Sequence, residues 1–182
     1  MQRWISELAL AVALTGCFFH TASGASAQVS DQYRAHVRTG MSSFVVGDVA
    51  NARRHFQEAL ALAPSHPDAL CYTAELNRGT GDLNAALDGF QDCLRFAREA
   101  NDRRFVARAL HGIASTLERM PERTADARNA WQEYVRFADG ASDVADGRIG
   151  RARIEVIDAW TTLEQRMVEV RARIAERERA AR

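Results

Sequence analysis

Two stretches of this chain carry the same residue pattern 34 positions apart. The repeated positions are Gly47-Asp48, Ala52, Phe56, Ala59 and Leu60, which recur as Gly81-Asp82, Ala86, Phe90, Cys93 and Leu94. Self-similarity at a fixed period is typical of proteins built from stacked copies of one structural unit. The pattern therefore predicts a helical-repeat array. Such arrays present extended binding surfaces more often than they perform chemistry.

The spacing within each stretch predicts a pair of helices joined by a tight turn. Small and aromatic residues recur at i, i+4, i+7 and i+8, which places them on one face of the second helix. Gly47 and Gly81 suit a left-handed helix end, and the aspartate after each can cap the next helix. Pro64 and Pro67 fall between the two units, where a helix must be interrupted.

A third, longer unit follows the first two. The same order of small, aromatic and aliphatic residues returns at Ala127, Trp131, Tyr134 and Val135. Trp131 lies 41 positions after Phe90, so the third unit exceeds the 34-residue period. We expect the extra residues in 101–104 and 120–124, and a first helix from Phe105 to Arg119.

These residues resemble the tetratricopeptide repeat (TPR) family. Its pattern has a small residue midway along the first helix, as at Gly40, Ala74 and Gly112. Ser43 and Asn77 depart from it, because the family usually has a large aromatic residue there. The resemblance implies an all-α fold, a short right-handed solenoid of about three TPR-like helix pairs closed by a long C-terminal capping helix. The implied repeats cover 33–139, with units at 33–66, 67–100 and 101–139.

The segment 140–182 is predicted to form that long helix. Its apolar residues are spaced by 4, 3, 4, 3 and 4 positions, which makes a heptad seam: Val156, Trp160, Leu163, Met167, Val170 and Ile174. Ile154, Ile157 and Val168 widen this stripe into a packing face. We interpret the helix as a cap that covers the apolar face of the third pair, as the end of a solenoid requires. A homodimeric coiled coil is the alternative.

The N-terminus has the features of an export signal. An apolar run too short to span a bilayer precedes Ala25-Ser26-Ala27, a small-residue pattern that signal peptidase accepts. We therefore predict a signal peptide at 1–27, a short segment at 28–32 and a soluble periplasmic product. Leu14-Thr15-Gly16-Cys17 resembles a lipobox, so the alternative is a lipoprotein signal at 1–16, lipidation of Cys17 and an outer-membrane anchor.

Composition disfavours several classes of function. Basic and acidic side chains both number 24 and there is no lysine, which disfavours nucleic-acid binding and lysine-dependent chemistry. The histidines at 36, 55, 66 and 111 are scattered, and no strand or phosphate-binding loop is visible. We expect no enzyme, cofactor or metal site. Cys71 and Cys93 are interpreted as small buried thiols, although an oxidising compartment permits a disulfide.

Binding is the function that this architecture supports. By the family resemblance, the first helix of each pair lines a concave groove, and the candidate groove residues are Arg34, Val37, Met41, Phe44, Asp68, Glu75, Arg78 and Ile113. The apolar members alternatively pack against their neighbours. We predict a scaffold that binds a cell-envelope protein or peptide as an adaptor or assembly factor. The alternative is a structural lipoprotein that self-associates through the last helix. The membrane would be contacted only through the lipid anchor.

Overall fold

The computed structural model describes residues 30–182 and is all-helical over that range, with no strand. The predicted signal peptide 1–27 and the candidate lipidation site Cys17 lie outside the described residues. The described helices are α1 (Asp31–Val45), α2 (Val49–Leu62), α3 (Pro67–Thr80), α4 (Leu83–Glu99), α5 (Arg103–Leu117), the 3₁₀ turn η1 (Pro121–Arg123), α6 (Thr124–Asp139) and α7 (Gly147–Ala180).

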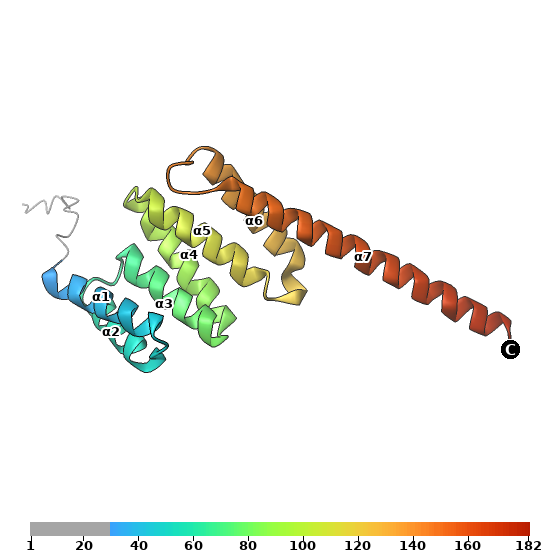
Figure 1. The fold of residues 1–182 in the computed structure, drawn as a ribbon, viewed down its shortest axis with the longest axis horizontal. Helices are drawn as coiled ribbons and strands as arrows, with labels where there is room; N and C mark the ends of the chain where they lie inside the picture. Colours follow the sequence, from blue (N-terminus) through green and yellow to red (C-terminus); the bar gives the residue numbers. More distant parts are fainter. Residues whose placement is uncertain (1–29) are drawn as a thin grey trace, which may run out of the picture.

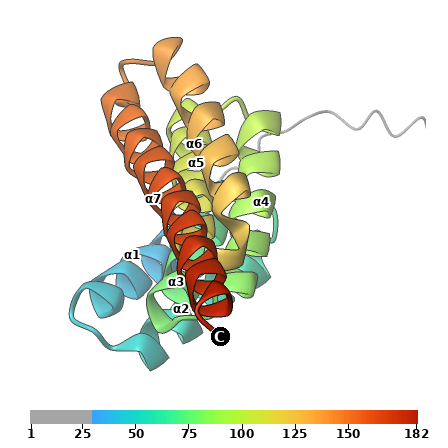
Figure 2. The same cartoon turned by 90° about the vertical axis from the view of Figure 1, so that its right-hand side faces the viewer.

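The helices pack in the order of the chain, each against the next (Figure 1). In the view turned by 90°, α7 runs toward the viewer beside α6 (Figure 2). Within the described range no helix combines the length and the apolar character needed to cross a bilayer. The structure thus confirms an all-helical protein with sequential helix packing.

The turns between paired helices form as the sequence predicts. Gly47 and Gly81 have φ values of 80° and 90°, the left-handed conformation that glycine adopts without strain. Asp48 caps α2 by accepting a hydrogen bond from the Asn51 amide, and Asp82 caps α4 in the same way. The first helix begins at Asp31, inside the segment 28–32 that was predicted to precede the repeats.

Aromatic side chains from the second helices fill the core against glycines of the first helices. Phe56 and Phe90 are completely buried. A Cβ added at Gly40 would lie 2.6 Å from the Phe56 ring, and one at Gly112 would lie 2.4 Å from the Phe90 ring. Phe90 therefore joins α4 to the following α5, because only a residue without a side chain leaves room for the ring.

The third pair is closed by the first part of α7. Gly150 allows this close approach, since a Cβ there would lie 2.6 Å from Val135. Ile157 is buried and Ile154 packs against the same core. At the surface, Asp158 accepts a hydrogen bond from Arg128 at 2.6 Å. The cap is thus built from the glycine and isoleucine face of α7.

The two described cysteines form a disulfide, so their interpretation as free thiols is wrong. Cys71 on α3 and Cys93 on α4 are both completely buried, with Cα atoms 5.3 Å apart. Each cysteine was correctly placed as a small buried residue of its own helix. Their pairing depends on the rotational setting of α3 against α4, which the periodicity of a single helix does not determine.

Candidate protein-interaction surface

The apolar residues predicted to line the first groove are partly core residues. Val37 is buried with Tyr33 and Ala59, and the half-buried Phe44 packs beside Phe56. Met41 is exposed, and so is Arg34. Ile113, half-buried, packs against the main core. These residues do not form one continuous apolar groove.

Asp68, another predicted groove residue, belongs to a hydrogen-bond network between α1 and α3. The Tyr33 hydroxyl donates to its carboxylate, and Nδ1 of His66 lies 2.6 Å from the same oxygen. Burial opposes ionisation of Asp68, but the hydrogen bonds from His66 and Tyr33 outweigh it and hold its pKa below the ordinary value. Burial, reinforced by the Asp68 hydrogen bond, raises the pKa of Tyr33. The network joins the first helix pair to the second.

We expect Asp68→Asn to lower the free energy of unfolding at pH 7 by about 1.5–3 kcal/mol, because hydrogen bonds to a partly buried charge are lost. The carboxyl pKa is lower in the folded chain, so its contribution is present above the unfolded pKa and is lost as pH falls through the folded value. Urea unfolding at pH 7 and near pH 3 measures the free energy of unfolding of both proteins. The difference in this free energy between wild type and variant should be smaller near pH 3. A difference that does not change with pH contradicts a stabilising role for the ionised Asp68 carboxylate.

Glu75 and Arg78 lie in a basic cleft between α3 and α5. Its volume is about 390 Å³, and Arg104, Arg108 and His111 also line it. Nε of Arg78 donates to Glu75 at 3.3 Å. Partial desolvation lowers the pKa of His111, and the charge of Arg78 lowers it further, so this imidazole is neutral at pH 7. The cleft therefore carries an excess of arginine charge.

The predicted heptad seam of α7 faces solvent and is not the capping face. Its six residues are between 47% and 57% exposed: Val156, Trp160, Leu163, Met167, Val170 and Ile174. α7 does pack against α6, as expected for a capping helix, and the contact is made by Ile154 and Ile157, two of the residues predicted to widen the stripe into a packing face. The C-terminal part of α7 projects from the array as a single helix (Figure 1).

An apolar hollow continues the seam onto the body of the array. It has a volume of about 620 Å³ and lies between η1, the start of α6 and α7. Trp160 and Leu163 belong to both the seam and the hollow, and Pro121 and Ala127 line the opposite wall. Monomeric proteins rarely expose contiguous apolar surface of this kind without a binding role. The seam and hollow together form the candidate interaction surface.

Two features of the surface were missed by reasoning from sequence. Arg104 and Arg108 lie four residues apart, a spacing that places both on one face of α5, but they were not included in the groove. The histidines are also less scattered than expected, because the packing of α1 on α2 brings His36 and His55 together. His55 and Glu58, three residues apart on α2, were the available signal.

The chain was compared with protein-family models and with curated proteins, and neither comparison found a match. The likeness to tetratricopeptide repeats therefore stays a resemblance of residues and spacing, and the candidate surface is defined by the side chains of α7, η1 and α6 alone.

Proposed function

We propose that this chain is an exported, non-catalytic helical-repeat scaffold that binds proteins of the bacterial cell envelope and self-associates through α7. The observation that carries the proposal is the exposed heptad seam on the projecting half of α7. At 34 residues the helix is roughly 50 Å long, and its C-terminal part projects beyond the other described helices (Figure 1). Exposure of a regular apolar stripe in water is unfavourable and is relieved when a second helix covers it.

A second copy of this chain is the occupant that fits the seam. Apolar residues at alternating spacings of three and four interlock with the same pattern on a neighbouring helix. Charges of both signs flank the stripe, with Glu164 and Arg171 along one side and Arg166 and Arg173 along the other. Three of these four side chains are basic, so the apolar stripe, and not the flanking charge, would hold the two copies together. The dimer would hold two repeat arrays on one paired stem, leaving their clefts available to envelope proteins or peptides.

The disulfide supports the export part of the proposal. Disulfides form and persist in oxidising compartments such as the periplasm, and they are rare in the reducing cytosol. Cys71 and Cys93 are bonded to each other in the described structure. A periplasmic product of the signal peptide 1–27 is consistent with this bond, as is a lipoprotein anchored through Cys17.

Self-association is tested by placing charge in the seam. We expect the wild-type chain to have the mass of a dimer by light scattering, and Leu163→Glu with Met167→Glu to have the mass of a monomer. Two carboxylates would have to be buried in the paired stem, which is strongly unfavourable. Both side chains are about half exposed in the single chain, so the variant should keep its helicity and its unfolding temperature.

A matched control places the same charges on the other side of the same helix segment. Gln165→Glu with Ala172→Glu adds two carboxylates to exposed positions away from the seam and should leave the dimer intact. A monomeric wild type across the measured concentration range refutes self-association. Dissociation of the control variant shows that added charge, and not the seam, governs assembly, and it contradicts the proposal equally.

A further inference from the structure

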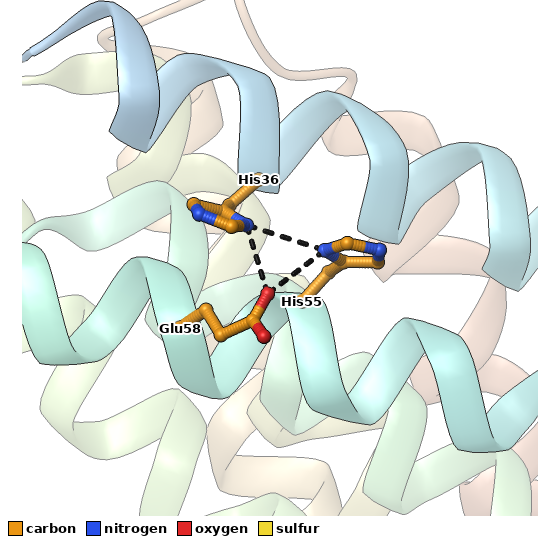
Figure 3. A group of neighbouring side chains, drawn as sticks. All are labelled: His36, His55 and Glu58. Atoms are coloured by element: carbon orange, nitrogen blue, oxygen red, sulfur yellow. Dashed lines mark hydrogen bonds and ion pairs between the residues drawn. The ribbon is translucent and has the colours of Figure 1, made fainter.

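Two histidines and a glutamate from neighbouring helices converge on one point in the first helix pair. His36 lies on α1, while His55 and Glu58 lie on α2 (Figure 3). The two Nδ1 atoms are 3.2 Å apart. Oε2 of Glu58 lies 2.9 Å from Nδ1 of His36 and 3.0 Å from Nδ1 of His55. Three potential ligand atoms thus form a compact triangle.

The geometry of this triangle suits a cation better than a set of hydrogen bonds. Oε2 of Glu58 is buried and accepts no hydrogen bond, although both imidazole nitrogens are close to it. The other carboxylate oxygen, Oε1, accepts a hydrogen bond from Arg54 at 3.0 Å. That bond holds the carboxylate with Oε2 toward the two rings. A buried carboxylate oxygen without a hydrogen bond is normally avoided, and a bound metal ion satisfies it.

The distances match those between ligands of a four-coordinate zinc ion. Zinc binds imidazole nitrogen and carboxylate oxygen at about 2.0–2.2 Å, so ligand atoms on a tetrahedral ion are about 3.3 Å apart. The triangle has sides of 2.9, 3.0 and 3.2 Å, and it needs to widen by only a few tenths of an ångström. The imidazoles of His36 and His55 are 23% and 15% exposed, which leaves access for the ion and for a water as fourth ligand.

The ligand chemistry also selects zinc from the common cations. Calcium and magnesium prefer sites made of oxygen ligands, whereas two imidazoles with one carboxylate favour zinc and its first-row neighbours. We propose that His36, His55 and Glu58 bind one zinc ion, which clamps α1 to α2. A metal on Nδ1 of His55 leaves the proton on Nε2, so the Arg54 NH2 group 3.1 Å from Nε2 has to shift. The other Arg54 nitrogen can keep its hydrogen bond to Oε1 of Glu58, because the side chain is 55% exposed and has room for this adjustment.

Calorimetric titration of the untagged full-length chain with zinc chloride tests the site. We expect one zinc per chain for the wild type and a loss of affinity of more than about 100-fold in His36→Gln, His55→Gln and Glu58→Gln, since each removes a ligand. His111→Gln is the matched control, because that histidine belongs to the cleft between α3 and α5 and should bind zinc as the wild type does. Cobalt added in place of zinc should give the intense visible absorption of four-coordinate Co²⁺ only when all three ligands are present.

Thermal unfolding gives a readout that does not depend on calorimetry. Zinc should raise the unfolding temperature of the wild type and of His111→Gln, and leave the three ligand variants unchanged. Far-UV circular dichroism without metal shows whether each variant is folded, and glutamine keeps much of the shape of the replaced side chain. Absence of stoichiometric zinc binding by the wild type overturns the proposal. Wild-type affinity in a folded double variant, His36→Gln with His55→Gln, overturns it too.

Discussion

Replacement of Phe90 by alanine is expected to lower the free energy of unfolding by about 3–5 kcal/mol, the range for deletion of a buried aromatic side chain. Phe90 is completely buried, and its ring occupies the space beside Gly112 on the next helix pair. Its removal leaves a cavity between α4 and α5 that the backbone cannot close without moving one pair against the other. Urea unfolding followed by circular dichroism measures the change. Phe96→Ala, on the same helix but outside the core cluster, should cost no more than about 1 kcal/mol.

The contact between the Phe90 ring and Gly112 also predicts how a substitution at Gly112 changes stability. In the wild type, Gly112→Ala places a Cβ 2.4 Å from the Phe90 ring and should destabilise the chain by about 1–3 kcal/mol. In the Phe90→Ala background that clash is absent, and the alanine should instead stabilise α5 by up to about 1 kcal/mol. The two substitutions are therefore expected to be strongly coupled. Additive effects in the double variant would show that the ring does not pack on this glycine.

Local structure was predictable because its causes lie within a few residues. The positions of Phe56 and Phe90 follow from the 3.6-residue helical period, and the helix ends follow from Gly47 and Gly81 with the aspartates after them. These signals act within single helices and single turns. The structure also shows helices that pack one after another along the chain, as expected for an all-helical protein.

Contacts between helices were not predictable in the same way. The pairing of Cys71 with Cys93 and the approach of His36 to His55 both depend on how one helix is rotated against its neighbour. Helical periodicity places each residue on a face but leaves that rotation open. The rotation is determined by the packing of side chains between helices, such as Phe56 against Gly40. This packing exists only once both helices have come together.

For the last helix, the sequence predicted the contact with the array but not which residues would be left exposed. α7 carries two overlapping apolar faces, the heptad seam and the face of Ile154 and Ile157. The regular spacing of the seam suggested that its residues would be covered, whereas the less regularly spaced isoleucines make the contact with the array. Gly150 decides between them, because it lets the backbone of α7 approach Tyr134 and Val135. The irregular face thus makes the contact within this chain, and the regular seam is left exposed.

Removal of the disulfide is the second change with a large expected effect on stability. The bond closes a loop between residues 22 positions apart, and loss of a loop of that size costs about 3 kcal/mol through the greater freedom of the unfolded chain. Cys71→Ala with Cys93→Ala should lower the free energy of unfolding by this amount. Position 93 should accept alanine without a clash, because Ala59, 34 positions earlier in the same sequence pattern, is likewise completely buried.

The effect of a reductant separates the lost bond from any loss of packing. Reduction of the wild type should lower its stability to about that of the double variant, whereas the same reductant should not change the double variant. Cys17 is present in both proteins, so it cannot account for the difference. Equal stability of the oxidised and reduced wild type, with free thiols counted after denaturation to establish each state, contradicts a stabilising disulfide. Because α3 and α4 are the middle pair, and Phe90 on α4 holds the third pair, reduction should loosen the array on both sides of Cys93.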